Sequence, residues 1–459
     1  MKIDIYNYSE VYRAMFQKME SDKNAIQEFE GLCGDGPILE IGAGTGRTLG
    51  FIKNHECVML EKDERMFAIL AEEAKSFPNV EILEGDSRAL PFEKEYFSGV
   101  YLAFATIGEL NPICVTLGEI HRVLRDDGKL FLFGMNPESF VPSHLGIFRA
   151  KELKLKDFSV VSNTFTIRDQ GMGEAQTHLS VKVPGASSHF SVSQYFPTID
   201  QWKILLDELG FEPLNSLDSQ RGSGIISIIA KKRMGAKIYA NQKQQSGVSQ
   251  VYDSLSLSYE SFTKDSNYGV PRWLSAQLAE YRGMHPLIVD LACGVGLVGK
   301  LIEVEDVKPN FLYGYDISQG MVERCRELSV YNSVVRFDIS KGLPGIGALR
   351  VDVVTAFGLM EFVADCEPIL YEIRRVLCLG GVALLTFELS DSEAGSTVQE
   401  LRFGDASVKR YARPQHEIES LISKIGFDII SATKELGYRS PTTGAEVNYL
   451  YVKAKRTEL

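Results

Sequence analysis

A short segment in which an acidic residue leads into a glycine-rich turn occurs twice in this chain, about half its length apart. Residues 38–46 read ILEIGAGTG and residues 288–296 read IVDLACGVG. In each copy an apolar strand pattern ends in the acid, Glu40 or Asp290, and an apolar helical pattern follows the turn. Glycine lets the backbone turn tightly and approach a ligand closely, and a helix N-terminus presents free N–H groups. The segment therefore predicts a nucleotide-like binding site, present twice.

Further elements recur downstream of both turns at an almost constant spacing. The acid that ends the second strand pattern is Glu61 in the first half and Asp316 in the second, and the acid after the third pattern is Asp86 and Asp338. The offsets between corresponding elements lie between 250 and 255 residues. A spacing this steady over several elements indicates two copies of one fold.

The order of elements within each half predicts the architecture. Strand and helix patterns alternate, which is typical of a parallel sheet covered by helices on both faces. We expect one domain over residues 1–233 and a second over residues 251–459. Residues 234–250 are polar and poor in apolar side chains, so they are expected to form a linker.

The two halves differ in length at one place, which indicates an insertion in the first. Gly210 follows Gly128 by 82 residues, whereas Gly426 follows Gly381 by only 45. Within this stretch residues 177–183 and 189–196 alternate largely in period two around a turn signal. We expect an antiparallel hairpin or a small sheet there, within an insert near residues 135–200.

Composition excludes several classes of function. The net charge of −12 disfavours a nucleic-acid partner, because phosphate backbones are repelled. The seven cysteines contain no Cys-x-x-Cys pair, which argues against a metal site or a disulfide framework and fits a reducing cytoplasm. The first residues do not read as a signal peptide, and no apolar run reaches the roughly 18 residues of a membrane span. We therefore expect a cytoplasmic protein without a membrane partner.

The spacing of the acids suggests how a ligand would lie. An acid after the second strand can accept both hydroxyls of a ribose at the carboxyl edge of the sheet. An acid after the third could accept an adenine amino group, and the acid before the turn lies near a ligand ammonium; turn and cap chemistry is the alternative for both positions. A dinucleotide site is disfavoured because neither turn reads G-x-G-x-x-G. The candidate cofactor-binding residues are Glu40, Gly42, Gly44, Gly46, Glu61, Asp86, Asp290, Gly294, Gly296, Asp316 and Asp338.

These motifs resemble those of class I methyltransferases that use S-adenosylmethionine, whose turn reads D/E-x-G-x-G-x-G. The resemblance covers nearly the whole chain outside the linker and implies two tandem Rossmann-like α/β domains with seven-stranded sheets. The first half is similar to N-methyltransferases of amino sugars and small amines, through residues 8–12 and the inserted strands. The second is similar to methyltransferases with a Tyr-Asp…Tyr…Tyr-Gly-x-Pro stretch, here residues 252–271. Ala292 departs from the pattern, since it replaces the first glycine.

Candidate catalytic residues follow from the same resemblance and from their positions relative to the strand patterns. Tyr8, Tyr12, Tyr252, Tyr259 and Tyr268 are candidate lid residues over cofactor or acceptor, with amphipathic helix packing as the alternative. Glu109 and Glu361 follow the fourth strand pattern, where either could receive an acceptor ammonium or its proton; a helix N-terminal acid is the alternative. Methyl transfer needs mainly proximity, alignment and a dry site, so no metal is expected.

The function we expect is methyl transfer from S-adenosylmethionine to a small polar metabolite, more readily an amine than a hydroxyl. Two sites suggest successive methylations or two acceptor positions, in a monomer or homodimer. Three alternatives remain open. One half could be a non-catalytic binding or dimerisation module, the acceptor could be a hydroxyl, or the cofactor could serve a non-methyl reaction such as intramolecular cyclisation, because fold does not fix function.

Overall fold

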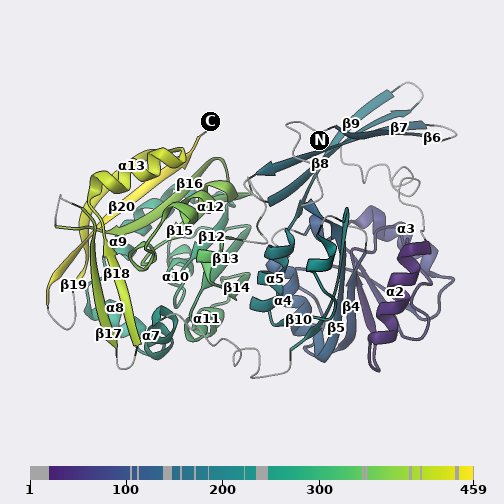
Figure 1. Cartoon of the computed structure of the whole chain (residues 1–459), viewed down its shortest axis with the longest axis horizontal. Helices are drawn as coiled ribbons and strands as arrows, with labels where there is room; N and C mark the ends of the chain where they lie inside the picture. The colour runs from purple at the N-terminus through teal and green to yellow at the C-terminus, as the bar shows by residue number, and fades with distance from the viewer. Residues whose placement is uncertain are drawn as a thin grey trace. The chain divides into compact units, whose positions relative to one another are not determined.

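The computed structural model divides the chain into two compact units, Met1–Asn241 and Gln242–Leu459, which we call unit 1 and unit 2 (Figure 1). It describes residues 20–103, 106–110, 113–137, 147–155, 158–169, 172–183, 186–221, 223–233, 247–343, 346, 350–391, 395–403, 406–439 and 444–457. Most of the predicted linker, and the candidates Tyr8 and Tyr12, lie outside these residues. Among the described residues, no helix combines the length and the apolar character that a membrane span requires.

Unit 1 contains a seven-stranded sheet in the order β10-β11-β5-β4-β1-β2-β3. Its strands are β1 (Ile38–Ile41), β2 (Cys57–Glu61), β3 (Val80–Glu84), β4 (Phe97–Leu102), β5 (Leu124–Met135), β10 (Phe211–Pro213) and β11 (Ile225–Lys232). The first five pair in parallel, and β11 pairs antiparallel with both β5 and β10. The α-helices among the described residues of this unit are α2 (Glu20–Leu32), α3 (Glu64–Ala74), α4 (Ile113–Val123) and α5 (Ile199–Glu208).

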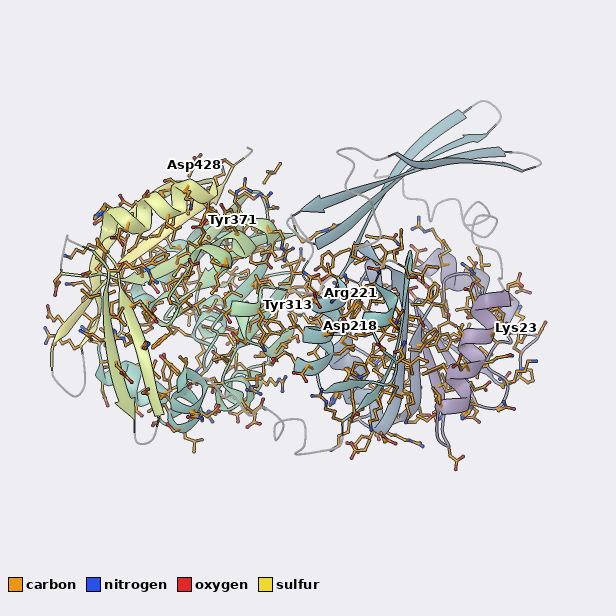
Figure 2. The ribbon with its side chains drawn as sticks, viewed as in Figure 1. Lys23, Asp218, Arg221, Tyr313, Tyr371 and Asp428 are labelled. Atoms are coloured by element: carbon orange, nitrogen blue, oxygen red, sulfur yellow. The ribbon has the colours of Figure 1, made fainter. Side chains whose placement is uncertain are left out.

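Ion pairs at the surface of unit 1 hold the connection between β10 and β11. The 3-10 helix η4 (Asp218–Gln220) joins β10 to β11. Arg221 Nε lies 3.1 Å from a carboxylate oxygen of Asp218, next to it in Figure 2, and Arg221 Nη2 lies 2.5 Å from Asp200 on α5. These ion pairs tie the connection to the helix that precedes β10.

Unit 2 repeats the same strand order, β14-β13-β12-β15-β16-β20-β19. Its strands are β12 (Leu287–Leu291), β13 (Phe311–Asp316), β14 (Ser333–Arg336), β15 (Val351–Ala356), β16 (Leu377–Glu388), β19 (Phe427–Arg439) and β20 (Glu446–Arg456). Its helices are α7 (Gly247–Leu255), α8 (Tyr259–Asp265), α9 (Val270–Leu278), α10 (Leu297–Val304), α11 (Gln319–Arg326), α12 (Glu367–Val376) and α13 (Gln415–Ile425). The two seven-stranded α/β sheets confirm the predicted fold class.

Each unit adds strands between the fifth strand of its sheet and the helix that follows. In unit 1 these are β6 (Ile147–Leu155), β7 (Phe158–Asp169), β8 (Met172–Val183) and β9 (Ala186–Phe196), which form one antiparallel sheet. The predicted hairpin is its β8–β9 half, and the antiparallel insert is confirmed. In unit 2 the addition is a smaller hairpin, β17 (Thr397–Phe403) and β18 (Ala406–Ala412), which the sequence patterns did not indicate.

The central strands of both sheets are covered on both faces, and their apolar composition follows from that burial. Every residue of β1 and of β4 is buried. Two charged residues interrupt these apolar runs at corresponding positions: Glu40 on β1 is 2% exposed and Asp290 on β12 is 1% exposed. A buried carboxylate is costly unless it is hydrogen-bonded, so its partners indicate what the position is built to do.

Candidate functional site

The glycine-rich turns have the same backbone conformation in both units. Gly42, Gly44 and Gly46 have φ angles of 72°, 56° and 85°, and the corresponding residues 292, 294 and 296 have 56°, 53° and 82°. A Cβ atom on Gly42 would lie 2.3 Å from Cγ2 of Thr106, so unit 1 requires glycine there. Ala292 adopts this left-handed conformation with a side chain, at a cost of roughly 1–2 kcal/mol.

The acid that ends the second strand reaches across to the glycine turn in each unit. Glu61 accepts a hydrogen bond of 2.7 Å from the backbone N–H of Gly44. Asp316 accepts the matching bond of 2.9 Å from Gly294, and a second of 2.9 Å from the N–H of Ser318. Burial raises the pKa of Asp316 to about 6 against the effect of these backbone bonds. The structure thus brings two predicted features together at the carboxyl edge of each sheet.

Glu40, the acid before the glycine turn of unit 1, is held by two hydroxyl groups of the same unit. Glu40 accepts a hydrogen bond of 2.7 Å from the hydroxyl of Tyr101 on β4, and another from the hydroxyl of Thr48. Burial raises the pKa of Glu40 to about 7, although both hydroxyl bonds favour the charged form. The two hydroxyls fix the position of this carboxylate beneath the glycine turn.

Asp290 has the same kind of support from different places in the chain. Its Oδ1 accepts a bond of 2.7 Å from Thr355 on β15, and its Oδ2 accepts one of 2.7 Å from Tyr331. The hydroxyl of Tyr331 also accepts a bond of 3.1 Å from the N–H of Gly299 on α10. Burial raises the pKa of Asp290 to about 7. Neither Tyr331 nor Tyr101 could be singled out from the sequence, because no motif or spacing links them to the acids.

The acid after the third strand differs between the units. Asp86 forms ion pairs with Arg88 at 2.6 Å and with Lys62 at 2.8 Å. Although burial opposes it, these cations hold the pKa of Asp86 well below its usual range. Asp338 instead accepts hydrogen bonds at Oδ1 from the backbone and hydroxyl of Ser340, at 3.1 and 2.7 Å. It also borders a pocket in unit 2.

Two pockets of unit 2 run along the glycine turn. One has a volume of about 340 Å³ and is bordered by Asp290, Gly294, Tyr268 and neighbouring residues. The other has a volume of about 230 Å³ and is bordered by Asp316 and Asp338 among others. Tyr259, Ala292, Gly294 and Phe357 border both. The acid before the turn therefore borders one of these two neighbouring pockets, and the two acids that follow the strands border the other.

A third and smaller pocket, of about 120 Å³, adjoins the first two and contains Glu361. Tyr259 borders all three pockets. Glu361 lies on the 3-10 helix η7 (Met360–Phe362) and is 2% exposed. Its Oε1 accepts a hydrogen bond of 2.6 Å from the hydroxyl of Tyr449, whereas its buried Oε2 has no hydrogen-bond partner among the described residues. Burial raises the pKa of Glu361.

The loop that carries Glu361 is held by one arginine. Arg413 is 8% exposed and donates hydrogen bonds of 3.0 Å to the carbonyl oxygens of Met360 and Ala364, and of 2.5 Å to that of Val363. These three carbonyls lie on either side of Glu361 in the chain. A planar guanidinium suits such a fork of acceptors. We therefore identify Arg413 as the side chain that fixes the acid in the small pocket.

One residue that borders the small pocket, Arg410, belongs to an ion pair. Arg410 on β18 forms a salt bridge with Glu388 at the end of β16, and its guanidinium carbon lies 5.4 Å from the centre of the Tyr438 ring. Because β18 packs against α7 and η7, the hairpin of unit 2 forms part of the pocket. No sequence pattern other than their charge marks these residues.

The counterpart of Glu361 in unit 1 has a different environment. Glu109 follows η2 (Thr106–Gly108), is exposed, and accepts a hydrogen bond of 3.0 Å from Nε2 of Gln194 on β9. It therefore touches the insert of unit 1, as expected for an acid near an acceptor. In the described part of the chain, no three His, Cys, Asp or Glu side chains come together as a possible metal site.

Comparison with known proteins agrees with this duplicated geometry. A family model described as a methyltransferase domain matches residues 38–128, and a second with the same description matches residues 289–385. No curated protein matches the sequence significantly.

Three solved structures are among those that are similar to part of the chain. They are the CcbJ methyltransferase of Streptomyces caelestis (17% identity, 50% of this chain and 97% of that one, TM-score 0.43), DesVI of Streptomyces venezuelae (18%, 51% and 100%, 0.39), and CalS10, an amino pentose methyltransferase of Micromonospora echinaspora solved with S-adenosylmethionine bound (18%, 50% and 98%, 0.39).

Proposed function

Because the chain carries two class I methyltransferase domains in tandem and uses S-adenosylmethionine as its methyl donor, we propose that it methylates the nitrogen of a small amine. Unit 2 supplies the site for which the geometry is most complete. The charge of −12 supports a small cationic acceptor over a nucleic acid. We further propose two cofactor sites per chain, which would serve two successive methylations or two positions of one molecule.

The residues of unit 2 fit the donor. Asp316 and Asp338 offer carboxylate oxygens beside the 230 Å³ pocket, where ribose hydroxyls and an adenine amino group need acceptors. Asp290 lies at the border of the 340 Å³ pocket, where its charge would favour an ammonium group. S-Adenosylmethionine, when bound, supplies a methyl group already activated by its sulfonium. In unit 1 the same roles are proposed for Glu61, Asp86 and Glu40, with Asp86 sharing its charge with two cations.

The observation that carries the proposal is the unpartnered oxygen of Glu361. A buried carboxylate oxygen without a hydrogen bond costs about 1–3 kcal/mol or more. Because Glu361 borders the small pocket, we propose that a ligand supplies the missing donor. An amine N–H is such a donor. Its nitrogen must lose a proton before or after the attack, and Oε2 of Glu361 is the proposed acceptor of that proton; burial raises the pKa of this carboxyl, which makes it a stronger base.

The proposed experiment compares Glu361→Gln with the unmodified chain in methyl transfer to a panel of small amines and their hydroxyl analogues. We expect kcat/KM for amines to fall about 100-fold or more, in line with the loss of a general base, while the affinity for S-adenosylmethionine stays the same. Glu446→Gln is the matched control, because Glu446 and its partner Arg439 are both more than half exposed. Transfer to hydroxyls but not to amines, or full activity of Glu361→Gln, would contradict the proposal.

The number of working sites is tested separately by calorimetric titration of S-adenosylmethionine. We expect two sites per chain, and one site in each of Glu61→Ala and Asp316→Ala. A single site in the unmodified chain would favour the alternative in which one unit is a non-catalytic binding or dimerisation module.

A further inference from the structure

Two charged side chains of opposite sign border the small pocket of unit 2. They are Glu361 on η7 and Arg410 on β18, and the other described residues that border this pocket are uncharged. Arg410 forms its described ion pair with Glu388 rather than with Glu361. Glu388 itself is not among the described residues that border the pocket. The small pocket therefore presents an acid and a base that do not pair with each other.

Both charged groups are held in place by neighbouring side chains. Arg413 fixes the loop of Glu361 through three backbone carbonyls. The guanidinium of Arg410 is fixed by its salt bridge to Glu388, and its carbon lies 5.4 Å from the centre of the Tyr438 ring. These two acids and two arginines balance one another, although the chain as a whole has a net charge of −12. A ligand that carries both a positive and a negative group preserves this balance, whereas a simple cation or anion does not.

Both groups also keep hydrogen-bonding capacity for a ligand. The buried Oε2 of Glu361 has no hydrogen-bond partner among the described residues. The side chain of Arg410 is only 12% exposed, and its described partners are Glu388, which accepts from Nη2, and Tyr438. A guanidinium has more N–H donors than these two partners engage. Because Arg410 borders the pocket, donors remain there for an anionic group.

These two groups suit the two ends of an amino acid. A guanidinium donates paired N–H groups to a carboxylate, in a planar arrangement that is stronger than its bonds to a neutral oxygen. An amine or ammonium group donates in turn to a carboxylate oxygen such as Oε2 of Glu361. The pocket has a volume of about 120 Å³, which is room for roughly four water molecules. The part of the ligand that joins the two ends is therefore short.

The neighbouring pockets indicate which end of the ligand lies toward the methyl donor. Gly358 and Phe362, on either side of Glu361 in the chain, border both the small pocket and the 230 Å³ pocket along the glycine turn. Arg410 borders the small pocket and is not among the described residues that border the other two. An amine at Glu361 therefore lies on the donor side, and a carboxylate at Arg410 lies on the side of the β17–β18 hairpin.

We infer that the acceptor of unit 2 is a small amine that also carries a carboxylate, as an amino acid does, with its amine at Glu361 and its carboxylate at Arg410. In the transfer the nitrogen forms one bond to the methyl carbon, and the carbon–sulfur bond breaks with both electrons left on sulfur. The proton of the nitrogen goes to Oε2 of Glu361, and the carboxylate of the acceptor is unchanged. Arg410 thereby determines specificity for an acidic amine over a plain one.

This inference rests on the proposed function, and the test separates the two. Glycine and glycinamide have the same amine and nearly the same size, but only glycine carries a negative charge; methylammonium lacks the second group altogether. Each is titrated at pH 7 against the full chain saturated with S-adenosylhomocysteine, and binding is read from the broadening of the ligand's proton resonances. We expect glycine to bind at least about tenfold more tightly than glycinamide, because a charged pair replaces a neutral one. Glu361→Gln should weaken all three probes.

Variants at Arg410 test whether this side chain causes the preference. Arg410→Gln should bring the affinities for glycine and glycinamide to within about twofold of each other and leave that for glycinamide unchanged. Arg410→Lys keeps a charge beside Glu388 but not the planar fork, so it should fold and retain part of the preference; it carries the test if Arg410→Gln unfolds on heating earlier than the unmodified chain. Arg439→Gln is the matched control, because Arg439 and its partner Glu446 are both more than half exposed.

The outcomes distinguish the inference from the proposed function. Equal affinities for glycine and glycinamide in the unmodified chain, or a preference that both Arg410 variants retain in full, would overturn the inference. An equal loss of both probes in the Arg410 variants would also overturn it, because Arg410 would then only hold the hairpin. The proposed function stands in each of these cases if Glu361→Gln still weakens methylammonium. Absence of binding of all three probes, or binding insensitive to Glu361→Gln, would overturn both.

Discussion

The buried acid beneath the glycine turn should make the stability of unit 2 depend on pH. Asp290 is fully enclosed, and both of its oxygens accept hydroxyl hydrogen bonds, from Tyr331 and Thr355. Asp290→Asn keeps the size of the side chain and removes the charge. Its carbonyl can accept one hydroxyl bond and its amide can donate to the other hydroxyl, as a protonated carboxyl would. The variant therefore reports the cost of ionising this position.

The size and sign of the effect follow from the two pKa values. The pKa of Asp290 is about 7 in the folded chain against an ordinary value of 3.8. Between these values the folded chain retains a proton that the unfolded chain has lost, so the free energy of unfolding falls as pH rises from about 4 to about 7. At about 1.36 kcal/mol for each unit of pKa, this amounts to about 4 kcal/mol. Asp290→Asn has no carboxyl to ionise at this position, so its free energy of unfolding should rise relative to that of the unmodified chain between about pH 4 and pH 7.

Thermal unfolding at pH 5, 6, 7 and 8 measures this difference. About 2 of these pKa units fall between pH 5 and the folded pKa of about 7, which corresponds to about 2.7 kcal/mol. For a unit of this size, 1 kcal/mol corresponds to about 2–4 °C, so the Tm of Asp290→Asn relative to the unmodified chain should rise by roughly 5–10 °C from pH 5 to pH 8. Glu40→Gln should show the same trend in unit 1, because the pKa of Glu40 is also raised to about 7 by burial. Glu446→Gln is the exposed control. A Tm difference that stays constant with pH would refute the reasoning.

Three further predictions concern the glycine-rich turns and the small pocket of unit 2. Arg413→Lys, which cannot reproduce the fork to three carbonyls, should lower kcat/KM about tenfold and shift the pH profile of activity without changing the Kd for S-adenosylmethionine, measured by calorimetry. Gly42→Ala should lower the stability of unit 1 by more than about 1 kcal/mol, because the strain of a left-handed side chain is added to a steric clash, whereas Ala292→Gly should change unit 2 by less than about 1 kcal/mol; denaturant unfolding compares them. Tyr331→Phe removes two hydrogen bonds of a buried hydroxyl and should cost about 2–3 kcal/mol in the same assay.

Much of the fold could be predicted from the sequence because the same pattern of strands and helices occurs in both halves of the chain. Central parallel strands are apolar throughout, so they stand out, and the repeat at a constant offset fixed their order in both halves. The β8–β9 hairpin was predicted from its alternation and its turn. The hairpin β17–β18 was not, because its strands are short and rich in charged residues such as Arg402 and Lys409, so their period-two pattern is weak.

The site was predictable only where chemistry is tied to a motif. Glu61 and Asp316 follow strands next to a glycine turn, and their bonds to the turn come from that adjacency. The supports of the site come from elsewhere: Tyr331 lies before a strand, and Arg413 lies before a helix. Nothing local marks either residue, since its role depends on which loop the tertiary fold brings beside it. The roles of the acids toward the cofactor remain predictions.

In the part of the chain that the structure describes, the β17–β18 hairpin of unit 2 borders the small pocket but not the pockets along the glycine turn, so the choice of acceptor can change independently of donor binding. Leu401, Val408 and Arg410 of this hairpin border the small pocket together with Glu361. Among the described residues, none that borders the two pockets along the glycine turn comes from the hairpin. Substitutions in it can therefore change which acceptor fits and leave the donor's surroundings untouched. Replacing these two strands offers a route to new acceptor preferences on an unchanged methyl-donor scaffold.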